Sequence, residues 1–201
     1  MDLAKHIEEN KSQAVDTLKE LIRIRSDAGD PVTTPSGEVY PFGQGVQDAF
    51  AYMLKKAEEY GFETANADNY GGHIDFGSGD KTVGIIGHLD VVPAGDGWDF
   101  DAYSGAESDG YIYGRGTTDD KGPLLACFFA MKALKDAGYE PQRRIRLIMG
   151  LDEETNWIGI QRYREKLGAP DYGFTPDGDF PILNGEKGMI GFDIAKKLSP
   201  S

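Results

Sequence analysis

A few short stretches of this sequence carry side chains that can bind a metal ion or move a proton. These residues are His88 and Asp90, the pairs Asp119–Asp120 and Glu153–Glu154, and Asp177. One imidazole among several carboxylates is a donor set for a hard or borderline cation such as Zn²⁺ or Mn²⁺. A cation of this kind lowers the pKa of water, and a neighbouring carboxylate can then take the proton as a general base. The chemistry indicated is metal-assisted hydrolysis.

Each of these residues also has an ordinary structural interpretation. A lone histidine at the end of a strand is more often a hydrogen-bonded structural residue than a ligand. Asp119 and Asp120 could cap the helix that follows them. The Glu153–Glu154 pair could lie in a first helical turn, where the helix dipole favours acidic groups. Asp177, in TPDG, is typical of a turn.

The spacing of these residues suggests which could bind a metal and which could support binding or activate water. A histidine that ligates a metal usually donates its other ring N–H to a carboxylate, and Asp90 follows His88 by two residues. Glu153 and Glu154 are adjacent and point in different directions. One of them could therefore bind the metal while the other faces the attacking water.

The hydrophobic pattern predicts the elements that must position these residues. Strands are expected at KTVGIIGH, RRIRLIMGLDEE and YGFTPDG, with shorter ones in FETANAD and HIDFGSG and a further one beginning at GMIGFDIAKKL. Helices are expected at about 3–24, 44–60, 121–138 and 156–168, and a long polar, glycine-rich loop at about 92–118. The alternation of strands and helices predicts an α/β fold with a largely parallel sheet.

The predicted strands would bring the candidate residues together. In open α/β sheets, ligands bind beyond the carboxyl ends of the strands. His88 ends one predicted strand, the run 152–154 ends a second, and Asp177 ends a third, while Asp119 precedes a helix. If these strands are neighbours, the residues converge at one edge of the sheet, which caps and turns alone would not explain.

Composition excludes several classes of function. The formal net charge is −13, from 34 acidic and 21 basic residues, so no basic surface is available for nucleic acid. No apolar run is long enough to cross a membrane, and the N-terminal residues have no apolar signal core. Cys127 is the only cysteine, which fits a reducing compartment. We expect a soluble, cytoplasmic protein with no nucleic-acid or membrane partner.

Four motifs in order resemble a known family. GHLDVVP, YGRGTTDDKGP, LDEETNW and TPDGDFP are similar to those of the di-zinc metallopeptidases of the aminoacylase, glutamate carboxypeptidase and succinyl-diaminopimelate desuccinylase clan. Within that clan they most resemble the bacterial β-Ala-Xaa (carnosinase-like, PepV-type) dipeptidases. The resemblance covers essentially all 201 residues. It implies a three-layer α/β sandwich, the fold of a zinc-peptidase catalytic domain.

The resemblance also implies a set of metal ligands. His88 and Asp177 would bind one zinc ion, Glu154 would bind a second, and Asp119 would bridge the two. The family typically has a cis peptide bond after the residue that matches Asp119. Two Zn²⁺ ions are expected in the full enzyme, with Mn²⁺ or Co²⁺ as alternatives.

The remaining roles implied by the resemblance concern catalysis. Glu153 would act as general base and later as proton donor, and Asp90 would orient His88. The reaction would be hydrolysis of the amide bond of a small peptide, a dipeptide above all, by a metal-activated water.

The sequence also departs from the family pattern. The second zinc of relatives has a histidine from a later segment, and neither His6 nor His73 matches that position. Relatives also have a lid domain inserted after the strand that begins near Gly188. We therefore expect residues 1–201 to be the N-terminal portion of a catalytic domain. The lid and a C-terminal segment, the remainder of its own chain, would be its partners, and without them activity should be weak or absent.

Two other functions remain open. The first is hydrolysis of N-acyl amino acids by another amidohydrolase of the same clan, because substrate choice resides largely in the lid. The second is a non-catalytic module that binds a peptide, although the presence of both Glu153 and Glu154 argues against it. The two tryptophans, Trp98 and Trp157, are expected to serve packing rather than substrate binding.

Overall fold

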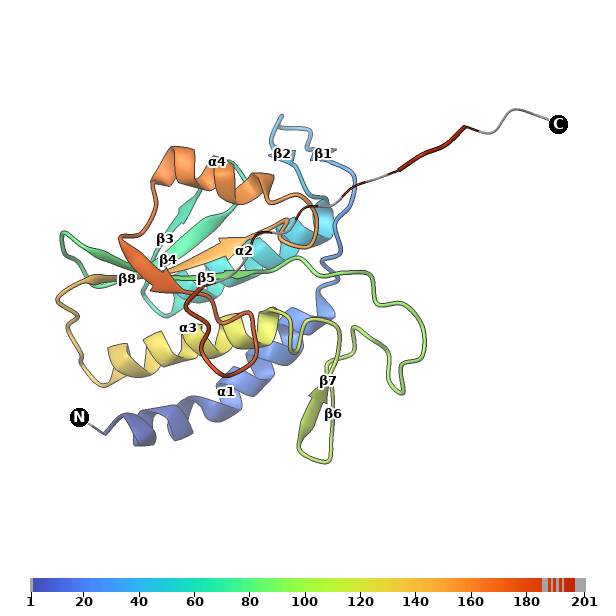
Figure 1. The fold of residues 1–201 in the computed structure, drawn as a ribbon. Coiled ribbons are helices and arrows are strands. Elements are labelled where there is room, and N and C mark those ends of the chain that lie inside the picture. The colour runs from blue at the N-terminus through green and yellow to red at the C-terminus, as the bar shows by residue number, and fades with distance from the viewer. Residues whose placement is uncertain (1, 186–187, 189, 191, 193, 198–201) are drawn as a thin grey trace.

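The computed structural model is a mixed α/β fold built on a five-stranded sheet (Figure 1). It describes residues 2–185, 188, 190, 192 and 194–197. In chain order the elements are α1 (Leu3–Arg23), β1 (Val32–Thr33), β2 (Val39–Tyr40), α2 (Gln44–Glu59), β3 (Glu63–Asn66), β4 (Gly72–Phe76), β5 (Thr82–His88), β6 (Ala106–Ser108), β7 (Tyr111–Tyr113), α3 (Lys121–Asp136), β8 (Arg144–Gly150), α4 (Ile158–Leu167) and β9 (Tyr172–Phe174).

The central sheet has the strand order β3-β4-β8-β5-β9 and is largely parallel, as the sequence predicts. Strand β5 pairs in parallel with β8 on one side and with β9 on the other. Strand β4 pairs antiparallel with both β3 and β8, so it alone runs against the other four strands. The three strands expected to carry the candidate residues are therefore neighbours.

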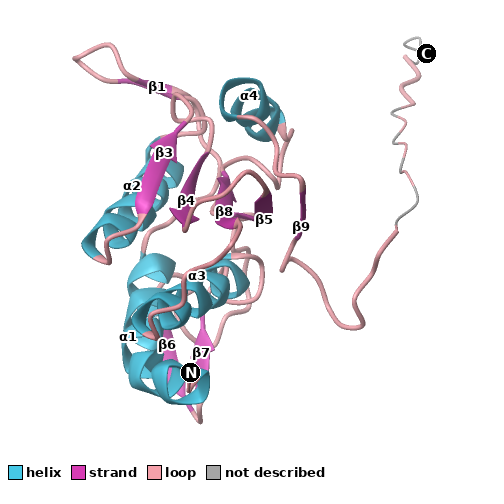
Figure 2. Cartoon of the chain, turned by 90° about the vertical axis from the view of Figure 1, so that its left-hand side faces the viewer, coloured by secondary structure: helices cyan, strands magenta, loops and turns pink. Residues whose placement is uncertain are grey.

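Helices cover both faces of this sheet and complete three layers (Figure 2). Helices α1, α2 and α3 lie on one face and α4 lies on the other. Because successive side chains of a strand point to opposite faces, Ile74 of β4 faces the three-helix side while its neighbour His73 faces α4. The three-layer sandwich implied by the family resemblance is thus confirmed.

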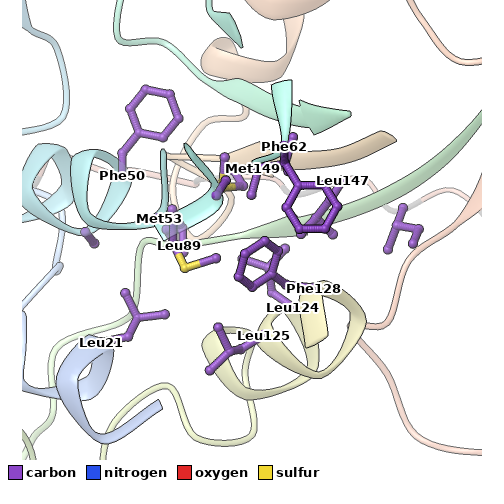
Figure 3. Close-up of a cluster of buried hydrophobic side chains, with 14 of the residues drawn as sticks. Leu21, Phe50, Met53, Phe62, Leu89, Leu124, Leu125, Phe128, Leu147 and Met149 are labelled. Carbon is purple, nitrogen blue, oxygen red and sulfur yellow. The ribbon is translucent and has the colours of Figure 1, made fainter. Parts of the chain in front are cut away.

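The larger hydrophobic core lies between the sheet and helices α1–α3 (Figure 3). Phe50 and Met53 of α2 and Phe128 of α3 are fully buried against Leu147 of β8. Burial of large apolar side chains contributes about 1.5–3 kcal/mol each, so this layer is the main source of stability. It holds β5 and β8 rigidly, and their carboxyl ends position the candidate residues.

The structure differs from the sequence-based expectations at several boundaries. The expected loop at 92–118 contains the antiparallel hairpin β6–β7, and two residues of each of β1 and β2 pair within the loop before α2. Helix α4 begins at Ile158, two residues later than expected. The strand expected from Gly188 includes residues 189, 191 and 193, which lie outside the described residues. In the described part of the chain, no helix is both long and apolar enough to cross a membrane.

A fully buried lysine joins α1 to α3. The Nζ of Lys121, the first residue of α3, donates to the carbonyl oxygens of Leu21 (3.1 Å) and Ile24 (2.8 Å) at the end of α1. Burial lowers the pKa of Lys121 to about 8. Because carbonyl groups at a helix C-terminus lack intrahelical donors, this contact satisfies them and fixes where α3 begins.

His73 lies within the sheet on the α4 side. Its Nδ1 is 2.7 Å from the Tyr163 hydroxyl oxygen, and its Nε2 is 3.5 Å from Asp75 Oδ2. Burial lowers the pKa of His73 to about 4. His73 is thus a structural histidine bonded to α4.

The lowered pKa of His73 makes stability depend on pH. Between pH 6.5 and pH 4 the unfolded chain binds a proton that the folded chain does not, so the free energy of unfolding falls as the pH falls through this window. A change from pH 7 to pH 5 should lower the free energy of unfolding by about 2 kcal/mol through the titration of His73. Urea unfolding of the parent and of His73→Gln at both pH values tests this. An equal loss of stability in the two proteins would contradict it.

Candidate metal centre

The candidate residues lie at the carboxyl ends of three neighbouring parallel strands. His88 is the last residue of β5 and is paired with Gly150, the last residue of β8. The β8 strand leads directly into 152–154, and β9 leads into Asp177. Asp119 reaches the same place from the loop before α3. The sheet edge therefore brings these residues together, as expected from the strand order.

His88 Nε2 lies at the centre of a group of carboxylates. It is 3.0 Å from Asp119 Oδ1, 3.4 Å from Asp177 Oδ2 and 4.0 Å from Glu153 Oε2. The ligand atoms of His88, Asp119 and Glu154 all lie within 4.8 Å of one another, and so do those of His88, Glu153 and Asp177. Two overlapping sets of possible ligands thus share one imidazole.

Asp90 contacts both His88 and the segment that carries Glu154. His88 Nδ1 is 2.9 Å from the Asp90 carbonyl oxygen and 3.4 Å from its carboxylate Oδ1, so the backbone oxygen is the nearer partner. The other carboxylate oxygen, Oδ2, accepts a hydrogen bond from the Glu154 backbone N–H at 3.0 Å. Asp90 is fully buried and thereby connects the end of β5 to the end of β8.

Asp120 does not cap α3 with its side chain, so that interpretation is wrong for this residue. It occupies the N-cap position, but its carboxylate makes no capping bond. Instead, Oδ2 accepts a hydrogen bond from the His88 backbone N–H at 3.1 Å. The side chain is fully buried, and burial raises its pKa to about 7. The peptide bond between Asp119 and Asp120 is cis, as the family resemblance implies.

This contact requires a glycine at position 87, which no sequence pattern indicates. A Cβ atom on Gly87 would lie 2.2 Å from Asp120 Oδ2 and 2.7 Å from Leu124 Cδ1. Both distances are far below van der Waals contact. The missing side chain therefore makes room for the Asp120 carboxylate under the end of β5.

Asp152 lies at the same edge but supports α4 instead. Its carboxylate accepts hydrogen bonds from the backbone N–H groups of Ile158 (2.8 Å) and Gly159 (2.9 Å). These are donors in the first helical turn, which have no partner within the helix. Asp152 thus fixes the turn that contains Glu153 and Glu154.

The charges of the site are unbalanced. In the part of the chain that the structure describes, the only cationic side chain paired with Asp119, Glu153 or Asp177 is His88. Burial by itself would lower the pKa of His88. The hydrogen bond to Asp90 and the charges of Asp90 and Asp120 outweigh burial and raise the pKa to about 10. Burial, followed by the charge of Asp119, raises the pKa of Glu154.

This donor set fits a divalent cation. An imidazole nitrogen and carboxylate oxygens are the ligands that Zn²⁺ and similar ions take in proteins. The Nδ1 of the imidazole already has an oxygen partner, which leaves Nε2 directed at the carboxylates. A cation at this point would also offset the repulsion among the carboxylates.

Comparison with known proteins places the chain among peptidases. The profile described as peptidase family M20/M25/M40 matches residues 84–195. The β-Ala-Xaa dipeptidase of Lactobacillus delbrueckii subsp. lactis is 44% identical over 200 residues, which cover 98% of this chain and 42% of that protein. The putative dipeptidase YtjP of Bacillus subtilis is 42% identical over 180 residues, covering 90% of this chain and 38% of that protein. The chain therefore spans about two fifths of the length of these curated relatives.

Solved structures of dipeptidases are also similar to this chain. Human carnosine dipeptidase 1 matches with a TM-score of 0.74 and 30% identity, covering 89% of this chain and 41% of that one. The dipeptidase Dug1p of Saccharomyces cerevisiae matches with a TM-score of 0.64 and 25% identity, covering 82% and 37%. The resemblance read from the four motifs is thus confirmed.

Substitution of Gly87 tests the contact between Asp120 and His88. Gly87→Ala should displace the Asp120 carboxylate or the end of β5, costing about 1–3 kcal/mol of stability, as overpacking does. It should also weaken Zn²⁺ binding, because the His88 backbone moves. Gly29→Ala is the control, since the nearest atom to its Cβ would be 3.8 Å away. Urea unfolding and calorimetric titration measure both effects, and parental values for Gly87→Ala would refute the contact.

The raised pKa of His88 predicts that metal binding releases a proton. Without metal the imidazole is protonated below about pH 10. Ligation requires the neutral form, so Zn²⁺ binding at pH 7 should release about one proton, and affinity should rise with pH. Titration calorimetry in two buffers of different ionisation enthalpy counts the protons. Binding with no net proton release would contradict either the raised pKa of His88 or its role as a ligand.

Proposed function

Since the chain belongs to peptidase family M20/M25/M40, we propose that it forms part of the catalytic domain of a metal-dependent dipeptidase. The observation that carries this proposal is the group formed by His88 and four carboxylates at the ends of β5, β8 and β9. The names of the relatives support a dipeptide as substrate, because two of them are described as a β-Ala-Xaa dipeptidase and a carnosine dipeptidase.

The two overlapping ligand sets support a site for two cations. In this proposal His88 and Asp177 would hold one cation, Glu154 would hold the other, and Asp119 would contribute to both. Zinc is the expected ion, with Mn²⁺ or Co²⁺ as alternatives, because imidazole and carboxylate ligands suit all three. Structural and catalytic zinc ions usually take at least three protein ligands, so the second position would need a further ligand from outside these residues.

Glu153 is proposed as the general base. When bound, the cations would polarise the amide carbonyl and lower the pKa of water. Glu153 Oε2 accepts a proton from the water molecule whose oxygen attacks the carbonyl carbon. As the C–N bond breaks, Glu153 returns this proton to the leaving amine, and the carboxylate is regenerated. The products are the two amino acids, and no other reactant is consumed.

The curated relatives are longer than this chain, and this affects the rate of hydrolysis that we expect. These 201 residues correspond to about two fifths of each curated relative. We propose that they are the N-terminal portion of the catalytic domain and that a lid and a C-terminal segment supply substrate contacts and oxyanion donors. Loss of such donors typically costs a factor of about 10²–10³ in rate each, so hydrolysis by these residues alone should be weak.

Substitution of Glu153 tests the proposed mechanism. With Zn²⁺ or Mn²⁺ present, Glu153→Gln should lower dipeptide hydrolysis by about 10²–10⁴-fold, the usual contribution of a general base. Metal binding should persist, because the ligands remain. Glu165→Gln on the exposed side of α4 is the matched control and should hydrolyse the dipeptide at the same rate as the parent.

The assay should include β-alanyl dipeptides, α-dipeptides and N-acetyl amino acids. Hydrolysis of N-acetyl amino acids alone would favour an amidohydrolase. Metal binding without hydrolysis of any of these substrates, in a chain that also carries the proposed lid and C-terminal segment, would contradict the proposal and favour a binding module.

A further inference from the structure

We propose that Trp157 is a positioning residue whose indole N–H holds the Glu153 carboxylate in the orientation needed for proton transfer. This inference rests on the proposed role of Glu153 as general base. Trp157 Nε1 donates a hydrogen bond to Glu153 Oε1 at 3.0 Å. The other oxygen, Oε2, is the one that lies 4.0 Å from His88 Nε2.

The chemistry of the two groups allows this hydrogen bond only one direction. An indole N–H can only donate, and an ionised carboxylate can only accept. The bond therefore occupies Oε1 and leaves Oε2 free toward the ligand group. Hydrogen bonds to charged groups are stronger than those between neutral groups, so this one favours a single orientation of a side chain that is partly exposed.

Trp157 is itself held firmly by the backbone. It occupies the N-cap position of α4 with φ of 55°, in the left-handed region. Its backbone N–H donates to the Asp152 carbonyl oxygen at 3.1 Å. The two residues that follow donate to the Asp152 carboxylate. The indole is thus attached to the end of β8 through Asp152, only four residues from the glutamate it contacts.

Packing does not account for this tryptophan. Trp157 belongs to neither of the hydrophobic clusters formed by the described residues. The other tryptophan provides a comparison within the same chain. Trp98 donates its indole N–H to a backbone oxygen, that of Ala94, at 3.0 Å, and its ring lies 5.5 Å from the Arg115 guanidinium carbon.

Without the hydrogen bond from Trp157, the Glu153 carboxylate could take a different role. One of its oxygen atoms lies in the same ligand group as a ring nitrogen of His88 and a carboxylate oxygen of Asp177. A freely rotating carboxylate could turn both oxygens toward a cation and act as a ligand instead of a base. The bond from Trp157 therefore keeps the base distinct from the ligands.

The indole signals of the ¹⁵N-labelled chain test the contact directly. Only two tryptophans are present, so Trp98→Phe assigns both indole N–H resonances. Glu153→Ala should shift the Trp157 resonance and speed its exchange with water by about tenfold or more, since a charge-assisted bond is lost. Glu153→Gln, which retains an acceptor oxygen, should largely preserve it. An unchanged Trp157 resonance in Glu153→Ala would overturn the inference.

Hydrolysis by the metal-loaded chain tests the consequence. Trp157→Phe keeps an aromatic ring but loses the donor, and should lower kcat about tenfold to a hundredfold with KM and cation affinity within about twofold of the parent. Trp98→Phe should match the parent. Parental kcat in Trp157→Phe would overturn the inference. If the parent shows no hydrolysis without the proposed lid and C-terminal segment, the indole resonance decides the inference alone.

Discussion

The main physical constraint on this structure is the repulsion among the carboxylates that surround one imidazole. Asp119, Glu153 and Asp177 all lie within 4.0 Å of His88 Nε2, and Glu154 lies in the same group. The possible ligand oxygens of Asp119 and Glu154 lie within 4.8 Å of each other, as do those of Glu153 and Asp177, so the negative charges repel one another. Asp90 and Asp120 raise the pKa of His88 against the effect of burial, so that the imidazolium also serves as a counter-charge for these carboxylates. A divalent cation would serve the same purpose better and would free the imidazole to ligate.

Three buried aspartates hold the site against this repulsion. Asp90, Asp120 and Asp152 are almost fully buried, and each accepts hydrogen bonds from backbone N–H groups. Asp120 fixes the end of β5, Asp90 fixes the turn after β8, and Asp152 fixes the start of α4. Neighbouring acidic residues thus divide into two kinds. The buried ones position the backbone, and the more exposed ones, Asp119 among them, are left to bind.

The sequence predicted the parts of the fold and site that follow from periodicity and strand order. The apolar run before His88 indicates a buried strand. Because parallel strands place their carboxyl ends at one edge of a sheet, the candidate residues were expected to lie together at that edge. The division of labour between Asp119 and Asp120 could not be predicted, because both fit a helix N-cap and only the course of the backbone shows which is buried. Gly87 gave no signal for the same reason, since its role is to leave space for a residue 33 positions later. Trp157 was expected to pack, and its contact with Glu153 depends on a left-handed turn that periodicity does not reveal.

The proposed function requires that this edge of the sheet bind divalent cations through His88, Asp119, Glu154 and Asp177. The most direct measurement is anomalous X-ray diffraction, at the zinc absorption edge, from crystals of the chain grown with Zn²⁺. We expect an anomalous peak within coordination distance of His88 Nε2 and Asp177, and a second peak beside Asp119 and Glu154 when the second position is filled. Zinc bound elsewhere on the chain, with these four side chains still paired only with one another, would contradict it.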